Sequence, residues 1–239
     1  MVEKGEKGCP PTLVLVAALN EEEGIGPTLA EVKNFLAGAF CLVVDGRSTD
    51  GTAKVAEAMG ARVVLQKGSG KGDAIATGLE HVRDLNVKYV ILIDADFTYP
   101  AEFLPRMIRI LEENPDVGMV TGNRFVGRFR LGRMHNILYT GNRMIALVHN
   151  MLNGVNLKDP LTGLRVVRWE ILKDWRPKSR SFDVEVELNH LVERKGFRIV
   201  EVPIYYRRRL GEKKLKVRHG FTILRRILIE SLTGFLNPY

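Results

Sequence analysis

The chain has 239 residues, of which 45% are hydrophobic and 27% charged, so its composition is that of a globular protein with a buried core and excludes a disordered or fibrous chain. Lysine and arginine outnumber aspartate and glutamate by 36 to 28, and the resulting formal charge of +8 indicates an anionic partner. No apolar run reaches the length of about 18 residues that a membrane-spanning helix needs, and the charged first residues do not predict a secretory signal peptide.

The first half of the chain alternates between two kinds of segment. Apolar, β-branched runs predict strands at Thr12–Ala17, Phe40–Asp45, Arg62–Leu65, Tyr89–Asp94 and Val117–Thr121. Helical periodicity predicts helices near residues 27–38, 51–59, 72–84 and 101–113. This alternation predicts an α/β fold with a mostly parallel sheet and helices on both faces, and ligands bind such sheets beyond the carboxyl ends of the strands.

After Gly122 the pattern changes. We expect a long helix near 134–152, a strand near Leu164–Val167, a helix at Asp183–Lys195 and a strand at Arg198–Val202. The last predicted helix, Phe221–Phe235, is amphipathic. Its apolar side chains are those of Phe221, Leu224, Ile227, Leu228, Leu232 and Phe235. No convincing linker or repeat interrupts the chain, so we expect a single domain over residues 1–239.

The positive charge is concentrated near the carboxyl end. Residues 207 to 226 hold nine basic side chains and one acid, so the rest of the chain is neutral. The basic residues are Arg207, Arg208, Arg209, Lys213, Lys214, Lys216, Arg218, Arg225 and Arg226. Beside an apolar helix face, this pattern is typical of a segment in the headgroup region of a membrane; a terminal helix packed on the domain is the alternative.

The aromatic residues near the basic segment and the two cysteines bear on the partner and the compartment of the protein. The nearby aromatic residues Tyr205, Tyr206 and Phe221 are not interleaved as a stacking platform, so we expect no nucleic-acid partner. The two cysteines, Cys9 and Cys41, cannot form a disulfide framework, and Cys41 lies in a predicted buried strand. A reducing compartment is therefore expected.

The strongest local motif is Asp94-Ala95-Asp96 at the end of an apolar run. Alternation along a strand would point both carboxylates to the same side. Adjacent carboxylates repel unless a divalent cation lies between them, and oxygen ligands suit Mg²⁺ or Mn²⁺ with substrate phosphates and water in the remaining positions. The alternative is a turn at the strand end with solvated acids.

Other polar groups follow the neighbouring strands. Asn20–Glu22 follows the first strand and Asp45 the second, so we expect acidic side chains to converge on one edge of the sheet. Residues 48–52 equally fit a simple helix start. Gly68–Gly72 opens another helix, and its glycines would let backbone N–H groups approach an anion. It lacks the P-loop pattern, so Walker-type chemistry is not expected.

Seven motifs occur in a fixed order: AALNEEEGI, VVDGRSTDGT, GSGKGDAIATG, DADFTYP, TGNRF, DPLTGLRVV and YRRRLGEKKL. Over about residues 12 to 230 this set resembles the inverting family 2 glycosyltransferases, specifically the dolichyl- or polyprenyl-phosphate sugar synthases. The resemblance implies a GT-A fold, with a Rossmann-like nucleotide-sugar-binding half at 12–122, an acceptor half at 123–215 and the amphipathic helix at 219–236.

The resemblance also implies an activity. A hexose, mannose in preference to glucose, would move from a nucleotide sugar to dolichyl or polyprenyl phosphate with Mg²⁺ or Mn²⁺ as cofactor. GDP-mannose is favoured over UDP-glucose as the donor. The enzyme would be cytoplasmic and peripheral on the cytoplasmic face of a membrane.

Residue roles are carried over by motif. The resemblance assigns nucleotide contacts to Leu19, Asn20, Glu21, Asp45, Lys71, Gly72 and Asp94. It assigns the metal to Asp94 and Asp96, and the acceptor phosphate to Arg124, Arg207, Arg209 and Lys214, with Asp96, Arg124 and Lys214 as catalytic residues. Asp159 and Arg165 match a loop that closes over the acceptor side.

The chain departs from the family pattern at several positions, including Ala17, where the family usually has proline. Gly46 replaces an acid of the nucleotide pocket, which leaves the identity of the base open. Thr98 stands where some members have a glutamine as a third metal ligand, and Lys213 stands where the family has serine.

The chemistry of the acceptor favours a phosphate. An alcohol needs a general base, whereas a phosphate monoester is already anionic and needs positive charge around it. No histidine accompanies a motif, and we interpret His135, His149, His190 and His219 as solvated or capping residues of helices. For a sugar hydroxyl acceptor, the base would be sought among Asp183, Glu185 and Glu187.

A sugar-1-phosphate nucleotidylyltransferase is the other alternative. Such enzymes share the logic of a parallel sheet with metal-binding carboxylates. They resemble one another in a glycine-rich loop after the first strand, where this chain reads AALNEEEG.

Overall fold

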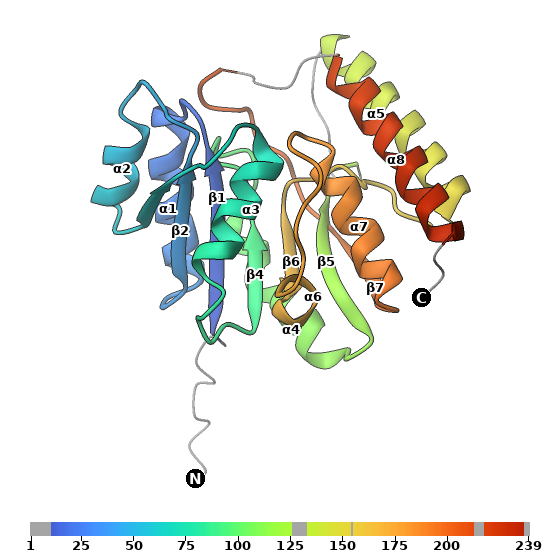
Figure 1. Ribbon diagram of the computed structural model, residues 1–239. Helices are drawn as coiled ribbons and strands as arrows, with labels where there is room; N and C mark the ends of the chain where they lie inside the picture. The colour runs from blue at the N-terminus through green and yellow to red at the C-terminus, as the bar shows by residue number, and fades with distance from the viewer. Residues whose placement is uncertain (1–10, 126–132, 154, 213–217, 237–239) are drawn as a thin grey trace.

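A seven-stranded sheet forms the centre of the computed structural model, which describes residues 11–125, 133–153, 155–212 and 218–236 (Figure 1). The strands lie in the order β3-β2-β1-β4-β6-β5-β7. Their bounds are Thr12–Ala18 (β1), Phe40–Asp45 (β2), Arg62–Leu65 (β3), Tyr89–Leu92 (β4), Val117–Asn123 (β5), Arg165–Arg168 (β6) and Arg198–Pro203 (β7). Strand β6 runs antiparallel to its neighbours β4 and β5, whereas the other pairs of adjacent strands are parallel.

Helices cover both faces of this sheet. Their bounds are Glu22–Phe35 (α1), Thr52–Ala58 (α2), Lys71–His81 (α3), Leu104–Glu113 (α4), Arg133–Asn153 (α5), Trp169–Leu172 (α6), Val184–Arg194 (α7) and Arg218–Leu236 (α8). A 3₁₀ turn, Ala101–Phe103, precedes α4. Side chains of α1, α2 and α4 pack on one face, and side chains of α3, α6 and α7 pack on the other.

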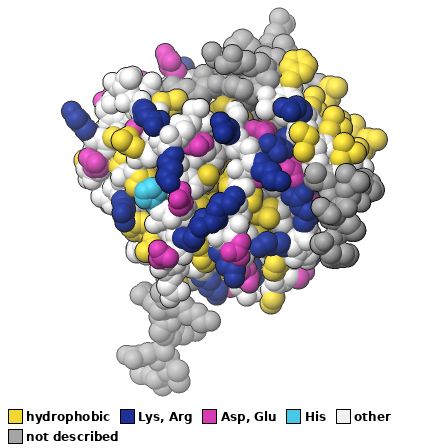
Figure 2. All heavy atoms as spheres, viewed as in Figure 1, with side chains coloured by type: hydrophobic (Ala, Val, Ile, Leu, Met, Phe, Trp, Pro, Cys, Tyr) yellow, Lys and Arg dark blue, Asp and Glu magenta, His cyan; other side chains and the backbone are white. Residues whose placement is uncertain are grey.

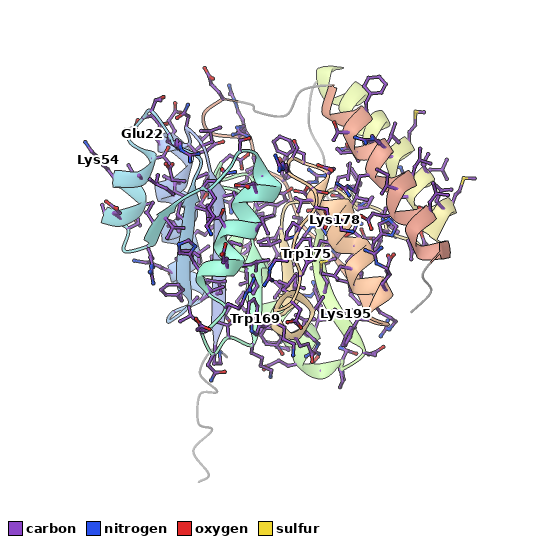
Figure 3. All side chains as sticks on the ribbon, in the orientation of Figure 1. Glu22, Lys54, Trp169, Trp175, Lys178 and Lys195 are labelled. Atoms are coloured by element: carbon purple, nitrogen blue, oxygen red, sulfur yellow. The ribbon has the colours of Figure 1, made fainter. Side chains whose placement is uncertain are left out.

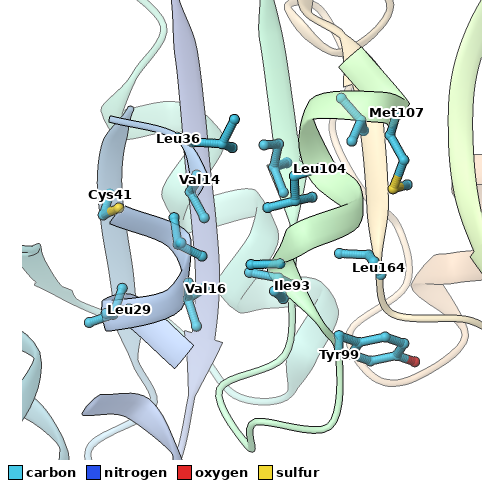
Figure 4. Packing of buried hydrophobic residues seen from close by; sticks show 14 of the residues in the cluster. Val14, Val16, Leu29, Leu36, Cys41, Ile93, Tyr99, Leu104, Met107 and Leu164 are labelled. Atoms are coloured by element: carbon cyan, nitrogen blue, oxygen red, sulfur yellow. The ribbon is translucent and has the colours of Figure 1, made fainter. Parts of the chain in front are cut away.

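The central strands are apolar throughout because both of their faces are buried. Val14 and Val16 of β1 pack with Leu29 of α1 and Leu104 of α4, as Figure 4 shows. The alternate residues, Leu13 and Leu15, point into the cluster on the opposite face. Each such fully buried side chain contributes about 1.5–3 kcal/mol relative to exposure. The cores on both faces therefore hold the strand ends, and the residues that follow them, in fixed positions.

Most of the predicted elements are confirmed, with shifted ends. Strands β2 and β3 have the predicted bounds, but β4 ends at Leu92, two residues before Asp94. Helix α1 begins at Glu22, well before the predicted start, and Pro27 lies inside it. Gly24 lets the first turn of this helix approach the loop after β4 closely, because a Cβ there would lie 2.6 Å from the carbonyl oxygen of Ala95. The helix thus passes against the backbone of the Asp-Ala-Asp motif.

The second half of the chain completes the same sheet. Strand β6 lies between β4 and β5, so residues 165–168 separate two strands of the first half. Strand β7 pairs in parallel with β5 at the edge. The antiparallel direction of β6 and the short helix α6 were not predicted, because a four-residue apolar run carries no information on direction.

Helices α5 and α8 lie side by side at one edge of the domain, and α8 also packs against α7 (Figure 1). Ile145 of α5, Val186 of α7, and Ile223 and Ile227 of α8 form a separate buried cluster. The apolar side chains of α8 therefore divide into an inward set and an outward set. Within the described residues, no helix is long and apolar enough to cross a membrane.

The interpretation of two histidines as solvated or capping residues is wrong. His149 and His190 are buried, with ring centroids 5.2 Å apart, where α5 meets α7. Burial lowers the pKa of His149 to about 4 and that of His190 to about 3, because a charged imidazole would lose its hydration there. Both rings are therefore neutral near pH 7. The side chains of His135 and His219 lie outside the described residues.

Candidate active site

Asp94 and Asp96 lie in the loop after β4, at the carboxyl edge of the sheet. The argument from strand alternation is therefore wrong, since the strand has already ended at Leu92. The two carboxylates are instead held by cations from distant parts of the chain. Lys71 Nζ lies 2.6 Å from Asp94 Oδ1, and Arg209 Nη1 lies 2.8 Å from Asp96 Oδ2.

Lys71 bridges two carboxylates. Its Nζ lies 2.6 Å from Asp94 and 2.7 Å from Glu185 of α7, and the lysine and glutamate side chains are largely buried. Burial alone would lower the pKa of Lys71, but the two carboxylates outweigh it and raise the pKa above its usual value. Burial raises the pKa of Asp94, yet the ammonium of Lys71 outweighs this and leaves that pKa below its usual value. Lys71 and Asp94 are therefore both charged near neutral pH.

Asp96 has a different environment. Its Oδ1 accepts hydrogen bonds from Thr98 N at 3.1 Å and Thr98 Oγ1 at 2.6 Å, so Thr98 orients the carboxylate. Burial and the nearby charge of Asp94 raise the pKa of Asp96, although Thr98 and Arg209 oppose them. Arg209 also pairs through Nη2 with Glu21 Oε1, so one guanidinium joins the ends of β1 and β4.

The two aspartates fit a divalent cation in part. They supply hard oxygen ligands, as Mg²⁺ and Mn²⁺ prefer. Gly163 leaves room beside them, because a Cβ there would lie 2.5 Å from Asp94 Oδ2. No group of three or more acidic, histidine or cysteine side chains suited to a metal occurs in the described part of the chain. A bound cation would thus depend on the two aspartates together with oxygens from a substrate and water.

Four of the predicted nucleotide residues, Leu19, Asn20, Glu21 and Asp45, lie at the ends of β1 and β2. Ser48 Oγ accepts a hydrogen bond from Asn20 N at 2.9 Å, and Thr49 N donates to Asn20 Oδ1 at 2.8 Å. Asp45 is buried and its Oδ2 accepts from Ser48 N at 3.1 Å, but its Oδ1 is buried with no donor among the described residues. Leu19 is 45% exposed. Asp45 Oδ1 is therefore a buried acceptor without a donor among the described residues, and Leu19 is an exposed apolar side chain at the same edge of the sheet.

Backbone strain gathers at the same edge. Among the described residues, those with positive φ that are not glycine are Asn20, Arg47 and Phe97, with φ between 50° and 65°. They follow β1, β2 and β4, respectively. Such conformations persist where the surroundings hold them in place, and they cluster at binding and catalytic sites.

The glycine-rich segment has another role than the one predicted. Gly72 N donates to Arg180 O at 3.2 Å, and a Cβ on Gly70 or Gly72 would lie within 2.2 Å of the carbonyl oxygens of Arg180 and Ser179. The glycines thus permit close packing of two backbone segments, and the idea of an open anion cradle is wrong. This packing directs the side chain of Lys71 toward Asp94.

The proposed trio of bases is engaged in structural contacts. Asp183 pairs with Arg226 of α8 at 3.1 Å, and Glu185 pairs with Lys71. Glu187 accepts from Trp175 Nε1 at 3.1 Å and from the backbone N–H groups of Lys178 and Ser179; Figure 3 labels Trp175 and Lys178 beside α7. Glu187 therefore fixes the segment around Ser179, against which Gly70 and Gly72 pack.

Two of the arginines predicted to bind the acceptor phosphate have internal partners. Arg124 forms a two-point ion pair with Asp159, with distances of 2.7 Å and 2.8 Å, and its guanidinium lies 5.4 Å from the ring centre of Tyr206. Arg207 pairs with Glu31 of α1 at 2.6 Å. Lys214, the remaining predicted cation besides Arg209, lies outside the described residues.

The predicted acceptor loop is held by buried polar groups that the sequence did not reveal. Arg165 is fully buried and donates to Pro160 O at 2.7 Å, Thr162 O at 2.8 Å and Asn189 Oδ1 at 2.6 Å. Glu201 of β7 accepts from Asp159 N at 2.7 Å. Arg165 thus holds the predicted acceptor loop through its bonds to Pro160 and Thr162. No local motif marks Asn189 or Glu201, since both act only through the tertiary fold.

Comparison with known proteins identifies relatives that match most of the chain. The family model described as glycosyl transferase family 2 matches residues 13–176. The chain is 35% identical over 206 residues to a dolichyl-phosphate hexose transferase of Haloferax volcanii, covering 84% of this chain and 85% of that one. It is 30% identical over 217 residues to an undecaprenyl-phosphate mannosyltransferase of Micrococcus luteus, covering 85% and 86% of the two chains.

Another relative is longer. The chain is 34% identical over 193 residues to glycosyltransferase AglJ of Haloferax volcanii, which covers 81% of this chain but only 62% of that protein. Among solved structures, a glucosyl-3-phosphoglycerate synthase of Mycobacterium tuberculosis, in complex with Mn²⁺, uridine diphosphate and phosphoglyceric acid, superposes with a TM-score of 0.72 at 23% identity. That superposition covers 94% of this chain and 78% of that one.

These matches agree with the geometry of the carboxyl edge. The structural superposition confirms the expected GT-A fold. The family match also decides against a sugar nucleotidylyltransferase. With a family model that covers most of the chain and relatives at 30–35% identity, the protein is a glycosyltransferase that belongs to glycosyl transferase family 2.

Proposed function

We propose that the protein transfers a hexose, with inversion, from a nucleotide sugar to dolichyl or polyprenyl phosphate, with Mg²⁺ or Mn²⁺ held at Asp94 and Asp96. Mannose is favoured over glucose, and GDP-mannose over UDP-glucose. The observation that carries the proposal is the similarity over more than four fifths of both chains to relatives named dolichyl-phosphate hexose transferase and undecaprenyl-phosphate mannosyltransferase.

The residues at the ends of β1 and β2 support a nucleoside diphosphate as the donor's leaving group. The free Oδ1 of Asp45 offers an acceptor to a ribose hydroxyl, and a buried acceptor without a donor destabilises the protein until a ligand or water supplies one. Exposed Leu19 offers an apolar surface to a base. Solved neighbours of this fold bind uridine diphosphate, so the choice of GDP over UDP is the finer part of the proposal.

The carboxyl edge supports a role for a divalent cation. When bound, such a cation acts as a Lewis acid on a diphosphate leaving group. The protein's own part is to hold the two aspartates: Lys71 orients Asp94, and Thr98 orients Asp96. The pKa of Asp96 is raised because burial and the charge of Asp94 disfavour its ionised form. A divalent cation beside Asp96, in addition to Arg209, would favour that ionised form.

The absence of a histidine from the immediate surroundings supports a phosphate acceptor. In the described part of the chain, the polar side chains that contact Asp94 and Asp96 belong to Lys71, Arg209 and Thr98. A phosphate monoester needs no general base, but it needs cations that orient it against an equally negative donor. Arg209 and Lys214 are the residues we assign to this task, and Arg124 assists it by fixing the loop at Asp159.

The outer surface of α5 and α8 supports a lipid acceptor. We define the α5–α8 face as Met144, Leu147 and Met151 of α5 with Phe221, Leu228 and Leu232 of α8. These side chains are between 51% and 76% exposed. Figure 2 shows hydrophobic side chains gathered where Figure 1 has these two helices. Apolar surface gathered in this way marks an interaction site.

We assign this face to the acyl region of a membrane, with the enzyme peripheral on the cytoplasmic side. Exposed Arg143 and Arg225 stand on the same two helices and suit anionic headgroups. The charge available to lipid is smaller than the sequence suggests, because Arg207, Arg209 and Arg226 are paired with carboxylates inside the protein. Apolar insertion therefore has the larger share of the proposed attraction.

The direct test supplies the protein with a panel of labelled sugar nucleotides and a polyprenyl phosphate in detergent, with Mg²⁺, Mn²⁺ or EDTA. We expect one sugar nucleotide, GDP-mannose, to give a lipid-soluble labelled product that requires the metal. Transfer to water-soluble phosphoglyceric acid but to no lipid phosphate would contradict the proposal. A product from UDP-glucose alone would keep the reaction and reverse the choice of donor.

A further inference from the structure

Arg209 occupies the carboxylate that the proposed function reserves for a metal. Its Nη1 lies 2.8 Å from Asp96 Oδ2, while its Nη2 pairs with Glu21 at the end of β1. The other oxygen of Asp96 is taken by Thr98. Among the described residues, both oxygens of this carboxylate therefore already have positive or hydrogen-bonding partners.

The backbone around Arg209 is fastened over the same loop. Arg207 N donates to Thr98 O at 3.0 Å, and Leu210 N donates to Asp96 O at 3.1 Å. Arg207 is anchored independently, since its side chain pairs with Glu31 and lies 4.2 Å from the ring centre of Phe97. The backbone on both sides of Arg209 is therefore held by contacts that do not involve its side chain. The guanidinium of Arg209 can leave Asp96 while the contacts of Arg207 stay in place.

We propose that Arg209 is an internal counter-ion that a divalent cation must displace from Asp96, and that the displaced guanidinium then becomes available to the acceptor phosphate. This inference rests on the proposed metal site. It assigns Arg209 a positioning role in two states of one site: on Asp96 and Glu21 before the metal binds, and beside the phosphate afterwards. A divalent cation and a guanidinium that both contact Asp96 Oδ2 repel each other, so binding of the metal favours departure of the guanidinium.

The consequence is an order of binding. The donor and its metal would free the cation that the acceptor needs, so the acceptor phosphate should bind more tightly once metal and nucleotide are present. Coupling between two ligands is reciprocal, so the acceptor should also tighten metal binding.

Mn²⁺ binding to the protein, measured with and without a nucleoside diphosphate by electron paramagnetic resonance, tests the displacement without an activity assay. Removing the competitor in Arg209→Gln should tighten Mn²⁺ binding by about tenfold or more, because a charge-assisted hydrogen bond contributes about 1.5–3 kcal/mol and each 1.4 kcal/mol corresponds to a factor of ten. Arg209→Lys should give an intermediate constant. Arg208→Gln removes the same charge from the adjacent exposed residue and should leave Mn²⁺ binding within about twofold.

The direction of the change decides the outcome. Unchanged or weaker Mn²⁺ binding in Arg209→Gln overturns the proposal, since Arg209 would then be neutral toward the metal or assist it. Circular dichroism establishes that the variant is folded, and Arg209→Lys provides the second measurement if it is not. Failure of every variant, with or without nucleotide, to bind Mn²⁺ overturns the metal assignment itself as well. Equal Mn²⁺ binding by all variants overturns only the displacement.

Discussion

The carboxyl edge of the sheet and the α5–α8 face differ in how their side chains are used. At the edge, the charged groups around the two aspartates of the motif are paired: Lys71 with Asp94 and Glu185, and Arg209 with Asp96 and Glu21. On the α5–α8 face, six large apolar side chains are exposed to solvent. The first region is organised before a ligand arrives, whereas the second has contacts left to make.

The two regions therefore contribute differently to the free energy of folding and to function. The ion pairs at the edge position carboxylates, and breaking one partner leaves a poorly hydrated charge behind. The α5–α8 face contributes little to folding, because its side chains are not removed from water. Mutations should therefore alter catalysis and stability together at the edge, but alter only membrane binding at the face.

The largest expected effect is that of Asp96→Asn on transfer. The amide still accepts from Thr98 but no longer supplies a charge to a metal, and we expect a loss of about 4 kcal/mol of transition-state stabilisation, or roughly a thousandfold in kcat/KM. The matched control is Asp116→Asn, which breaks the exposed pair with Arg198. Near-normal transfer by Asp96→Asn in EDTA would remove the metal from the account.

The next effect is on stability, and it compares two lysines. Lys71→Met leaves Asp94 and Glu185 without their shared cation and should lower the free energy of unfolding by about 3 kcal/mol in urea titrations. Lys67→Met breaks an exposed pair with Glu80 and should have a much smaller effect.

A further variant sharpens that comparison. Adding Glu185→Gln to Lys71→Met removes one of the two abandoned charges and should restore part of the lost stability. Equal losses for Lys71→Met and Lys67→Met would show that the buried triad has no special role.

A third prediction separates the two sides of α8. Replacing exposed Phe221, Leu228 and Leu232 with serine should reduce sedimentation with lipid vesicles several-fold and leave the urea midpoint nearly unchanged. Replacing buried Ile223 or Ile227 with serine should instead lower the free energy of unfolding by about 2 kcal/mol or more. Undiminished vesicle binding by the first variant would exclude the α5–α8 face as the membrane contact.

The last prediction concerns the dependence of stability on acidic pH. His149 and His190 have folded-state pKa values of about 4 and 3, below their usual value near 6.5, so the unfolded chain binds more protons as the pH falls from 6.5. Their contribution to stability is therefore lost progressively below pH 6.5. Glu193 acts in the opposite direction, because burial raises its pKa to about 7.

The comparison of variants isolates the histidines. Replacing both with asparagine should make the thermal midpoint less sensitive to pH between 6.5 and 5 than that of the unmodified protein. An identical pH dependence for both proteins would contradict the assignment of the pair as neutral and buried.

The carboxyl edge could be predicted well because the topology dictates it. Parallel strands place their carboxyl ends together, so Asn20, Asp45 and Asp94 had to converge once the strands were identified. What could not be predicted was the partner of each cation. The contact of Lys71 with Glu185 depends on packing against residues 179–181, which are more than a hundred positions away in the chain.

The α5–α8 face was only partly predictable. Helical periodicity identified α8, but an apolar stripe does not tell which of its members meets another helix and which meets solvent. Ile227 turned inward to α7, while Leu228, its neighbour, remained exposed. Arg124 shows the same limit, since its motif indicated an acceptor contact and could not reveal the buried pair with Asp159.

The central claim is that the two regions serve one substrate, the phosphate at the edge and the lipid at the face. The most direct test compares transfer to a long polyprenyl phosphate in vesicles with transfer to a short, water-soluble prenyl phosphate. The variant Met144→Ser/Leu147→Ser/Met151→Ser should lose most of its rate with the vesicle acceptor and keep its rate with the soluble one. Equal rates with both acceptors, or equal losses on both, would contradict the account.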